Sequence, residues 1–373
     1  MKIYRPSYYK NFRCIGSACS DNCCIGWEID IDDDSAERYL SVPGDFGQRL
    51  KNSIACDEEG HHFILSGERC PFLNQDNLCD IFIHMGENAL CDICTQHPRF
   101  HEWFGDWKES GLGLCCEAAG KLIFEAPSPA SFEIAVSDEE PSDFEDSEWL
   151  NCLFHARETA FQIIQDRSRS FIERLLLLVI YGEELQQDLN ACSTQLVMKD
   201  AQAYADPQMA LQITLPDCQC SREELFAQLL DTFLPLEPID PAWPEKLCFI
   251  REHMADVLKS WDQLVKERPQ CWEEYEKFAV YIIFRYFLKS VFDDEVSSKT
   301  GLAAVSCLMM FLLDGERYLQ KKAFSLEDRI FLAKQYSKEI EYCTENLEAL
   351  ADHYWNTETG AAFLTAILQS FSL

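Results

Sequence analysis

The sequence predicts a mainly α-helical protein in which a small, irregular, cysteine-rich α+β module is followed by an all-α domain. Eleven of the nineteen cysteines lie in the first 116 residues, and after residue 149 apolar residues recur with helical spacing. A segment rich in proline and acidic residues separates the two regions. We therefore expect a module over residues 1–125, a linker over 126–148 and a helical domain over 149–373.

Ten of the eleven cysteines of the module form two tight groups. The first group is Cys14, Cys19, Cys23 and Cys24, and the second is Cys70, Cys79, Cys91, Cys94, Cys115 and Cys116. Thiolates are soft ligands that select zinc, copper(I) or iron–sulfur clusters, and short spacings let one turn of backbone present two thiolates to one ion. The sequence therefore predicts a metal-binding or cluster-binding module.

The alternative is a disulfide scaffold, which is common in small secreted proteins. The chain starts without a charged and then apolar signal peptide, its cysteine count is odd, and 373 residues can bury a core without disulfides. The adjacent pairs Cys23–Cys24 and Cys115–Cys116 also suit a disulfide framework poorly. We therefore expect reduced thiols and a cytoplasmic location.

Short strands are expected in the module. Residues 27–32 alternate apolar and acidic side chains, which is typical of a half-buried strand, and residues 62–65 are a second candidate. Sustained helical periodicity in the module is confined to residues 109–124. In the linker, prolines and acidic residues disfavour regular structure, although residues 132–136 are a candidate strand.

The helical domain carries recognisable helix starts. A serine is followed three residues later by an acidic residue, the pattern of a capping box, at Ser170 and Glu173, Ser221 and Glu224, and Ser325 and Asp328. A further amphipathic helix is expected over 278–291, and the apolar stretch 302–313 is expected to be buried. The domain's eight cysteines are predicted to be small core residues, and the close pair Cys218 and Cys220 is too weak a signal for a site.

Charge limits the partners of the chain. Thirty-two basic and sixty-four acidic residues give a net charge of −32. Such a field repels phosphate backbones, so nucleic acid is not an expected partner, whereas a cationic substrate would be attracted. Solubility alone is an equally good reason for this acidity. Because no apolar run reaches the ~18 residues of a membrane helix, we expect no membrane partner.

The motifs resemble those of a known family. The strings are CIGSACSDNCCIGWEI at 14–29, CPFL at 70–73, LCDI at 78–81, LCDIC at 90–94 and HPRF at 97–100. Together they resemble the flagellin lysine-N-methylase family and its cysteine-rich, zinc-binding or cluster-binding relatives. The string EKFAVYIIFRYFLKSVFD at 276–293 is similar to the helical half of that family.

The resemblance implies a cytoplasmic enzyme that transfers methyl groups from S-adenosylmethionine to flagellin lysines and holds an iron–sulfur cluster, of the 4Fe-4S type. It also implies which cysteines bind the metal, with Cys115 or Cys116 as the last of them. The implied ligands are Cys14, Cys19, Cys23, Cys24, Cys70, Cys79, Cys91, Cys94 and Cys115. A 4Fe-4S cluster needs only four thiolates, so some of these must have another role.

Several questions stay open in the sequence. The alternative function is a non-catalytic zinc or iron–sulfur module with a structural or redox-sensing role. Catalytic residues and the S-adenosylmethionine pocket are not identifiable, because no glycine-rich nucleotide motif follows a strand. Lysine has a pKa of about 10.4, so a polar methyl transfer needs a desolvated, aromatic-lined pocket and a proton acceptor. The aromatic candidates near the cysteines are Tyr4, Tyr8, Tyr9, Trp27, Trp103 and Trp107.

Overall fold

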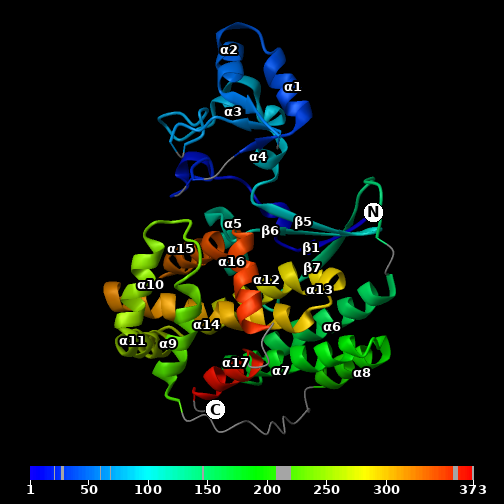
Figure 1. The fold of residues 1–373 in the computed structure, drawn as a ribbon, viewed down its shortest axis with the longest axis vertical. Coiled ribbons are helices and arrows are strands. Elements are labelled where there is room, and N and C mark those ends of the chain that lie inside the picture. Colours follow the sequence, from blue (N-terminus) through cyan, green and yellow to red (C-terminus); the bar gives the residue numbers. More distant parts are fainter. Residues whose placement is uncertain are drawn as a thin grey trace.

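The computed structural model describes residues 1–20, 22–26, 29–58, 60–67, 69–144, 147–206, 220–355 and 360–371. Helices dominate these residues, which confirms the mainly α-helical prediction. Most of the cysteine-rich segment projects from one end of a helical body, and a sheet lies between the two (Figure 1).

The larger sheet has four strands in the order β5-β6-β1-β7. Their bounds are β1 (Lys2–Pro6), β5 (Arg99–Phe104), β6 (Trp107–Leu112) and β7 (Phe132–Val136). β1 runs parallel to β6 and antiparallel to β7, with Tyr4 opposite Glu109 and Ile134. β7 confirms the candidate strand within the predicted linker. The first strand, β1, thus pairs on its two edges with β6 and β7, which come later in the sequence.

The helix expected over residues 109–124 is partly wrong. Residues up to Leu112 belong to β6, and the helix α5 covers only Glu117–Glu125. β6 is an inner strand with both faces covered, and even Lys108, Glu109 and Ser110 are buried in it. A strand buried on both faces loses the alternation that identifies strands in a sequence.

The cysteine-rich segment has a hydrophobic core of its own, whose buried residues extend from Ile29 to Cys91. A three-stranded sheet, in the order β2-β4-β3, and short helices enclose this core. The elements are β2 (Asp30–Ile31), α1 (Asp33–Ser41), α2 (Gly44–Asn52), β3 (Ile54–Cys56), β4 (His61–Phe63), α3 (Asp80–Met85) and α4 (Asp92–Gln96). β2 lies within the first predicted strand segment and β4 overlaps the second, while Trp27 and Glu28 lie outside the described residues.

The main core is built by the helices after residue 147. These are α6 (Ser147–Gln165), α7 (Phe171–Asn190), α8 (Thr194–Tyr204), α9 (Arg222–Phe233), α10 (Trp243–Glu252), α11 (Met254–Glu267), α12 (Cys271–Tyr286), α13 (Ser290–Asp293), α14 (Val296–Lys321), α15 (Leu326–Tyr336), α16 (Thr344–Tyr354) and α17 (Gly360–Gln369). All three predicted capping boxes are present, at the starts of α7, α9 and α15. Side chains of β1, β5 and α5 share this core, so it extends across the predicted boundary at residue 125.

Helix α14 lies at the centre of the main core. Its length and composition would suffice to cross a membrane, but 89% of its most apolar window is buried inside the protein. That burial is typical of the core helix of a globular fold, and it confirms the predicted burial of residues 302–313. No other helix among the described residues passes the same test of length and apolarity.

The prediction that the later cysteines are core residues is confirmed for Cys152, Cys271, Cys307 and Cys343. It is wrong for Cys192, Cys220 and Cys248, which are exposed. Two of these lie at helix ends, where the apolar periodicity that supported the prediction no longer applies: Cys192 follows α7 and Cys220 precedes α9. Cys218 lies outside the described residues.

Candidate functional site

Five predicted ligands from both sequence groups meet in the small core. The core contains Cys70 and Cys91, and Cys24, Cys79 and Cys94 pack against it partly buried. The backbone N–H of Cys70 donates to the carbonyl of Cys24 at 2.9 Å, which joins the two sequence groups directly. Residues far apart in the chain thus place five cysteines in or against one small hydrophobic core.

The pKa values of these thiols show how closely they interact. A hydrogen bond with Cys23, burial and the neighbouring Cys70 and Cys79 raise the pKa of Cys24. A hydrogen bond with Cys91, burial and the neighbouring Cys24 and Cys70 raise the pKa of Cys94 in the same way. Deprotonation of one of these cysteines therefore makes deprotonation of Cys24 or Cys94 less favourable. A bound cation would reverse this balance, because metal coordination deprotonates thiols.

The two buried members of the set, Cys70 and Cys91, differ in acidity. Burial raises the pKa of Cys70 to about 11. Cys91 differs, because its hydrogen bond with Cys94 lowers its pKa despite burial. Soft sulfur donors in a dry environment are the chemistry that zinc and iron–sulfur clusters select, so the donor set fits such a group.

A second set of thiols lies at the start of α5. Burial, with smaller contributions from the neighbouring Cys19 and Cys23, raises the pKa of Cys116 to about 11. The carboxylate of Glu117 accepts hydrogen bonds from the backbone of Ser20 at 3.0 Å and from the Cys19 thiol at 3.8 Å. Cys23 therefore interacts with both sets of thiols.

The two remaining predicted ligands have other surroundings. Cys14 is exposed, and its sulfur accepts a hydrogen bond from the backbone of Gly16 at 3.4 Å. Cys115 is buried in the direction of the helical body, where it hydrogen-bonds the hydroxyl of Tyr342. Burial raises the pKa of Cys115 to about 12. Among the residues that the structure describes, no group of three or more Cys, His, Asp or Glu side chains converges closely enough to hold a metal ion. The full ligand set stays a prediction.

A polar site that the motifs did not indicate lies where α12 ends. Arg285 donates to the Glu341 carboxylate at 2.9 Å and to the Tyr281 hydroxyl at 2.7 Å. Tyr281 also donates to Glu341 at 2.8 Å and accepts from the backbone of Leu114 at 3.2 Å. Helix α12 is thereby tied to the turn between β6 and α5, two residues from Cys116.

Aromatic rings enclose this ion pair. The Arg285 guanidinium lies over the rings of Phe100, Tyr286 and Tyr342, at 4.8, 5.4 and 5.1 Å. Glu341 ends η5, a π-helical turn over Ser337–Glu341, and irregular turns of this kind are frequent at functional sites. One oxygen of Glu341, Oε1, is buried and has no hydrogen-bond partner among the described residues. It can accept one hydrogen bond or one proton.

Gly113 leaves room for the side chain of Tyr342. A Cβ at position 113 would lie 2.4 Å from the Tyr342 hydroxyl and 3.2 Å from the carbonyl oxygen of Pro98. We expect Gly113→Ala to displace Tyr342 and to lower the free energy of unfolding by about 1–3 kcal/mol, as overpacking does. Urea denaturation measures the effect. In the double variant Gly113→Ala/Tyr342→Phe, which lacks the hydroxyl, part of the loss should be recovered. A Gly113→Ala protein as stable as the wild type would contradict this account.

Comparison with known proteins gives one matching family model and three similar curated proteins. The sequence model of one protein family, described as the FliB lysine N-methylase C-terminal domain, matches residues 157–365. This range includes Arg285 and Glu341. Over 135 residues the chain is 30% identical to the flagellar biosynthetic protein FliU of Salmonella muenchen and 28% identical to a lysine-N-methylase of Salmonella typhimurium. These alignments cover 34% of this chain, 78% of FliU and 33% of the lysine-N-methylase. No solved structure matches the chain.

Proposed function

The chain belongs to the family of the FliB lysine N-methylase C-terminal domain, and from this membership we propose that it methylates lysine side chains of flagellin with S-adenosylmethionine as the methyl donor. Relatives from two Salmonella strains are named lysine-N-methylase, and a third relative is named a flagellar biosynthetic protein. The family match over more than half of the chain is the observation that carries the proposal.

We further propose that the thiols of the small core hold an iron–sulfur cluster, of the 4Fe-4S type. Cys24, Cys70, Cys79, Cys91 and Cys94 would supply its ligands, because they share one core and interact electrostatically. When bound, such a cluster supplies one-electron chemistry. Zinc is the alternative occupant, and the same thiols would then have a structural or redox-sensing role.

Two properties of the chain suit a lysine substrate. The net charge of −32 attracts a cationic side chain. Methylation then needs the ammonium group to lose its proton, since the protonated amine has no lone pair. Glu341 is the candidate acceptor, because its Oε1 is buried, has no partner among the described residues and lies in aromatic surroundings that lower the pKa of an amine.

The direct test incubates anaerobically purified protein with methyl-labelled S-adenosylmethionine and flagellin. We expect label on flagellin lysines, located by mass spectrometry, and no label on an acidic protein that is not part of a flagellum. Absence of label from flagellin in protein with a full iron content would overturn the proposal. A colourless protein that contains only zinc and transfers no methyl group would favour the non-catalytic module.

A further inference from the structure

Strand β7 forms one edge of the four-stranded sheet, in which β1 is its neighbour. The hydrogen bonds to β1 show which backbone groups of β7 face outward. Met1 and Ser137 exchange both backbone hydrogen bonds, at 2.9 and 3.0 Å. At the other end of the pair, the N–H of Ser7 donates to the carbonyl of Ser131 at 2.9 Å. In an antiparallel pair, residues bonded in this way alternate with residues whose N–H and C=O groups point away from the partner strand. The outward-pointing residues of β7 are therefore Phe132, Ile134 and Val136.

The side of β7 that carries these groups, its outer edge, is open along most of its length. Within the part of the chain that the structure describes, no group bonds to the backbone of Ile134 or Val136 on this side. Ile134 is 60% exposed and Val136 83%, whereas the ring of Phe132 stacks on Tyr4 at 5.1 Å and on Phe161 at 5.0 Å. Proteins usually protect such an edge with lysine or proline, and β7 contains neither. An anchored strand with an open apolar edge is a template for another strand.

Carboxylates lie on one face of this edge and beyond its end. Tyr4 is directly opposite Ile134, so both side chains project from the same face of the sheet. On that face the Tyr4 hydroxyl donates to the Glu158 carboxylate at 3.1 Å. After the strand, Asp138 and Glu140 are exposed and form no ion pair with any described residue. Unpaired carboxylates around a strand edge attract a segment with cationic side chains.

The other face of β7 has no such excess of negative charge. Glu133 projects there and accepts from Arg5 at 3.0 Å and from Lys10 at 3.3 Å. Its carboxylate is therefore already neutralised by two cations. The charges predict that a cationic side chain of an added strand lies on the face of Ile134 and Glu158.

The charges also choose between two occupants of the edge. A second copy of this chain would bring together two molecules that each carry a net charge of −32. A lysine substrate is cationic, and an extended segment of a protein provides the backbone groups that an open edge lacks. An extended segment of the substrate therefore fits the edge better than a second copy does.

We propose that the outer edge of β7 binds an extended segment of the protein substrate as an added strand, with a lysine or arginine on the face of Ile134. The inference rests on the proposed function. The edge is a docking surface and not the reacting site. β7 and β5 are opposite edges of the sheet, roughly 14 Å apart at the usual strand spacing, and Phe100 of β5 contacts Arg285. The docked segment and the methylated lysine are thus different parts of the substrate.

Ile134→Pro tests the proposal. Proline removes one outward N–H but no hydrogen bond between β1 and β7, and proline is tolerated at edge positions of this kind. With flagellin monomer as the probe, biolayer interferometry should show affinity about 10-fold or more weaker than that of the wild type. The KM for flagellin should rise by a similar factor with kcat unchanged, because the edge binds but does not react. Ile134→Val keeps the N–H and is the matched control, with an expected change of less than about twofold.

Two further variants keep the test decisive should Ile134→Pro fold poorly, which circular dichroism would reveal. Val136→Pro blocks the same edge at a more exposed residue and should weaken binding to a similar extent. The double variant Asp138→Asn/Glu140→Gln should bind a few-fold more weakly at low salt and like the wild type at high salt, since exposed charges are screened.

The outcomes separate this inference from the proposed function. Wild-type affinity and KM in both proline variants would overturn the docking edge alone. A wild-type dimer that Ile134→Pro dissociates, seen by sedimentation velocity, would assign the edge to a second copy and overturn it too. Binding of flagellin that depends on the edge but leads to no methyl transfer would overturn only the proposed function. Flagellin that neither binds nor gains methyl groups would overturn both.

Discussion

Replacing Cys70 with serine should remove the proposed metal from the protein and abolish the proposed methyl transfer. Cys70 is buried in the small core, and its backbone is hydrogen-bonded to Cys24 of the other sequence group. A serine hydroxyl is a hard donor that does not replace a thiolate on zinc or iron. Loss of a direct ligand should lower metal affinity by more than the ~10- to 100-fold that loss of an outer-shell partner costs.

Iron, zinc and acid-labile sulfide per chain, measured after anaerobic purification, check this result. Cys56→Ser is the matched control, because Cys56 lies in the same module but is exposed at the end of β3 and outside the predicted ligand set. The control should keep its metal and its absorption spectrum. Circular dichroism should show that the helical body persists in both variants, since its core is separate from that of the thiols. Full metal content in Cys70→Ser would refute the assigned role.

Local signals carried the successful sequence predictions. A capping box needs only a serine and an acidic residue three positions apart, so all three helix starts were predictable. The prediction that the two cysteine groups lie close together depends on the affinity of thiolates for a shared metal. The hydrogen bond between Cys24 and Cys70 agrees with that prediction. The separate surroundings of Cys115 were not predictable, because its partner Tyr342 is distant in the sequence and belongs to the helical body.

The remaining features depend on contacts that no local pattern encodes. Arg285 and Glu341 are 56 residues apart, and each alone reads as an ordinary charged residue of a helix surface. The sequence predicts a helix in place of most of β6 because successive residues of this strand, from Lys108 to Leu112, are all buried, so they show no alternation of apolar and polar side chains. Arg174 and Glu276 are 102 residues apart, and only the tertiary fold brings them into one ion pair.

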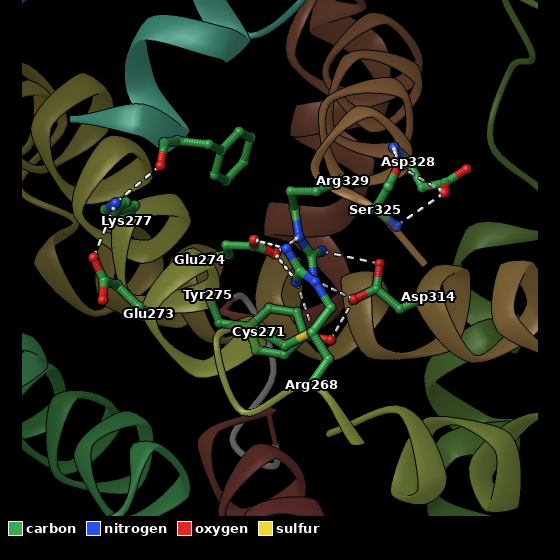
Figure 2. A network of polar contacts seen from close by, with 11 residues as sticks. Arg268, Cys271, Glu273, Glu274, Tyr275, Lys277, Asp314, Ser325, Asp328 and Arg329 are labelled. Atoms are coloured by element: carbon green, nitrogen blue, oxygen red, sulfur yellow. Dashed lines mark hydrogen bonds and ion pairs between the residues drawn. The ribbon is translucent and has the colours of Figure 1, made fainter. Parts of the chain in front are cut away.

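Replacing Arg329 with methionine should produce the largest loss of stability in the helical body. Figure 2 shows its guanidinium between two carboxylates inside the core. Arg329 donates to Asp314 at 2.9 Å and to Glu274 at 3.2 Å, and it lies 4.4 Å from the centre of the Tyr275 ring. Only 1% of the arginine is exposed, and Asp314 is fully buried.

The loss of stability follows from the carboxylate of Asp314, which remains buried without its arginine. Glu274 keeps a second partner, because Arg268 donates to it at 2.8 Å, but Asp314 would lose its only arginine among the described residues. Removing one partner of a buried ion pair costs about 3–5 kcal/mol. Urea denaturation should show this decrease. Arg251→Met, which breaks the exposed pair with Asp231, should cost no more than about 1 kcal/mol.

The loss should also depend on pH. Burial raises the pKa of Asp314 to about 6 while Arg329 pulls it down, so the pKa should rise further without the arginine. A carboxyl with a raised pKa in the folded state binds protons more tightly there, so its effect on stability becomes less favourable as pH rises from about 4 through the folded pKa. The difference between Arg329→Met and the wild type should therefore be larger at pH 8 than at pH 5.

The double variant Arg329→Met/Asp314→Asn separates charge from packing. It removes both charges of the pair, so it should regain most of the stability that the single variant loses and should lose the added pH dependence. Equal stability of the single and double variants at pH 8 would show that packing of the guanidinium against Tyr275, rather than the unpaired Asp314, is responsible. A single variant within about 1 kcal/mol of the wild type would show that the core tolerates the bare carboxyl in its protonated form.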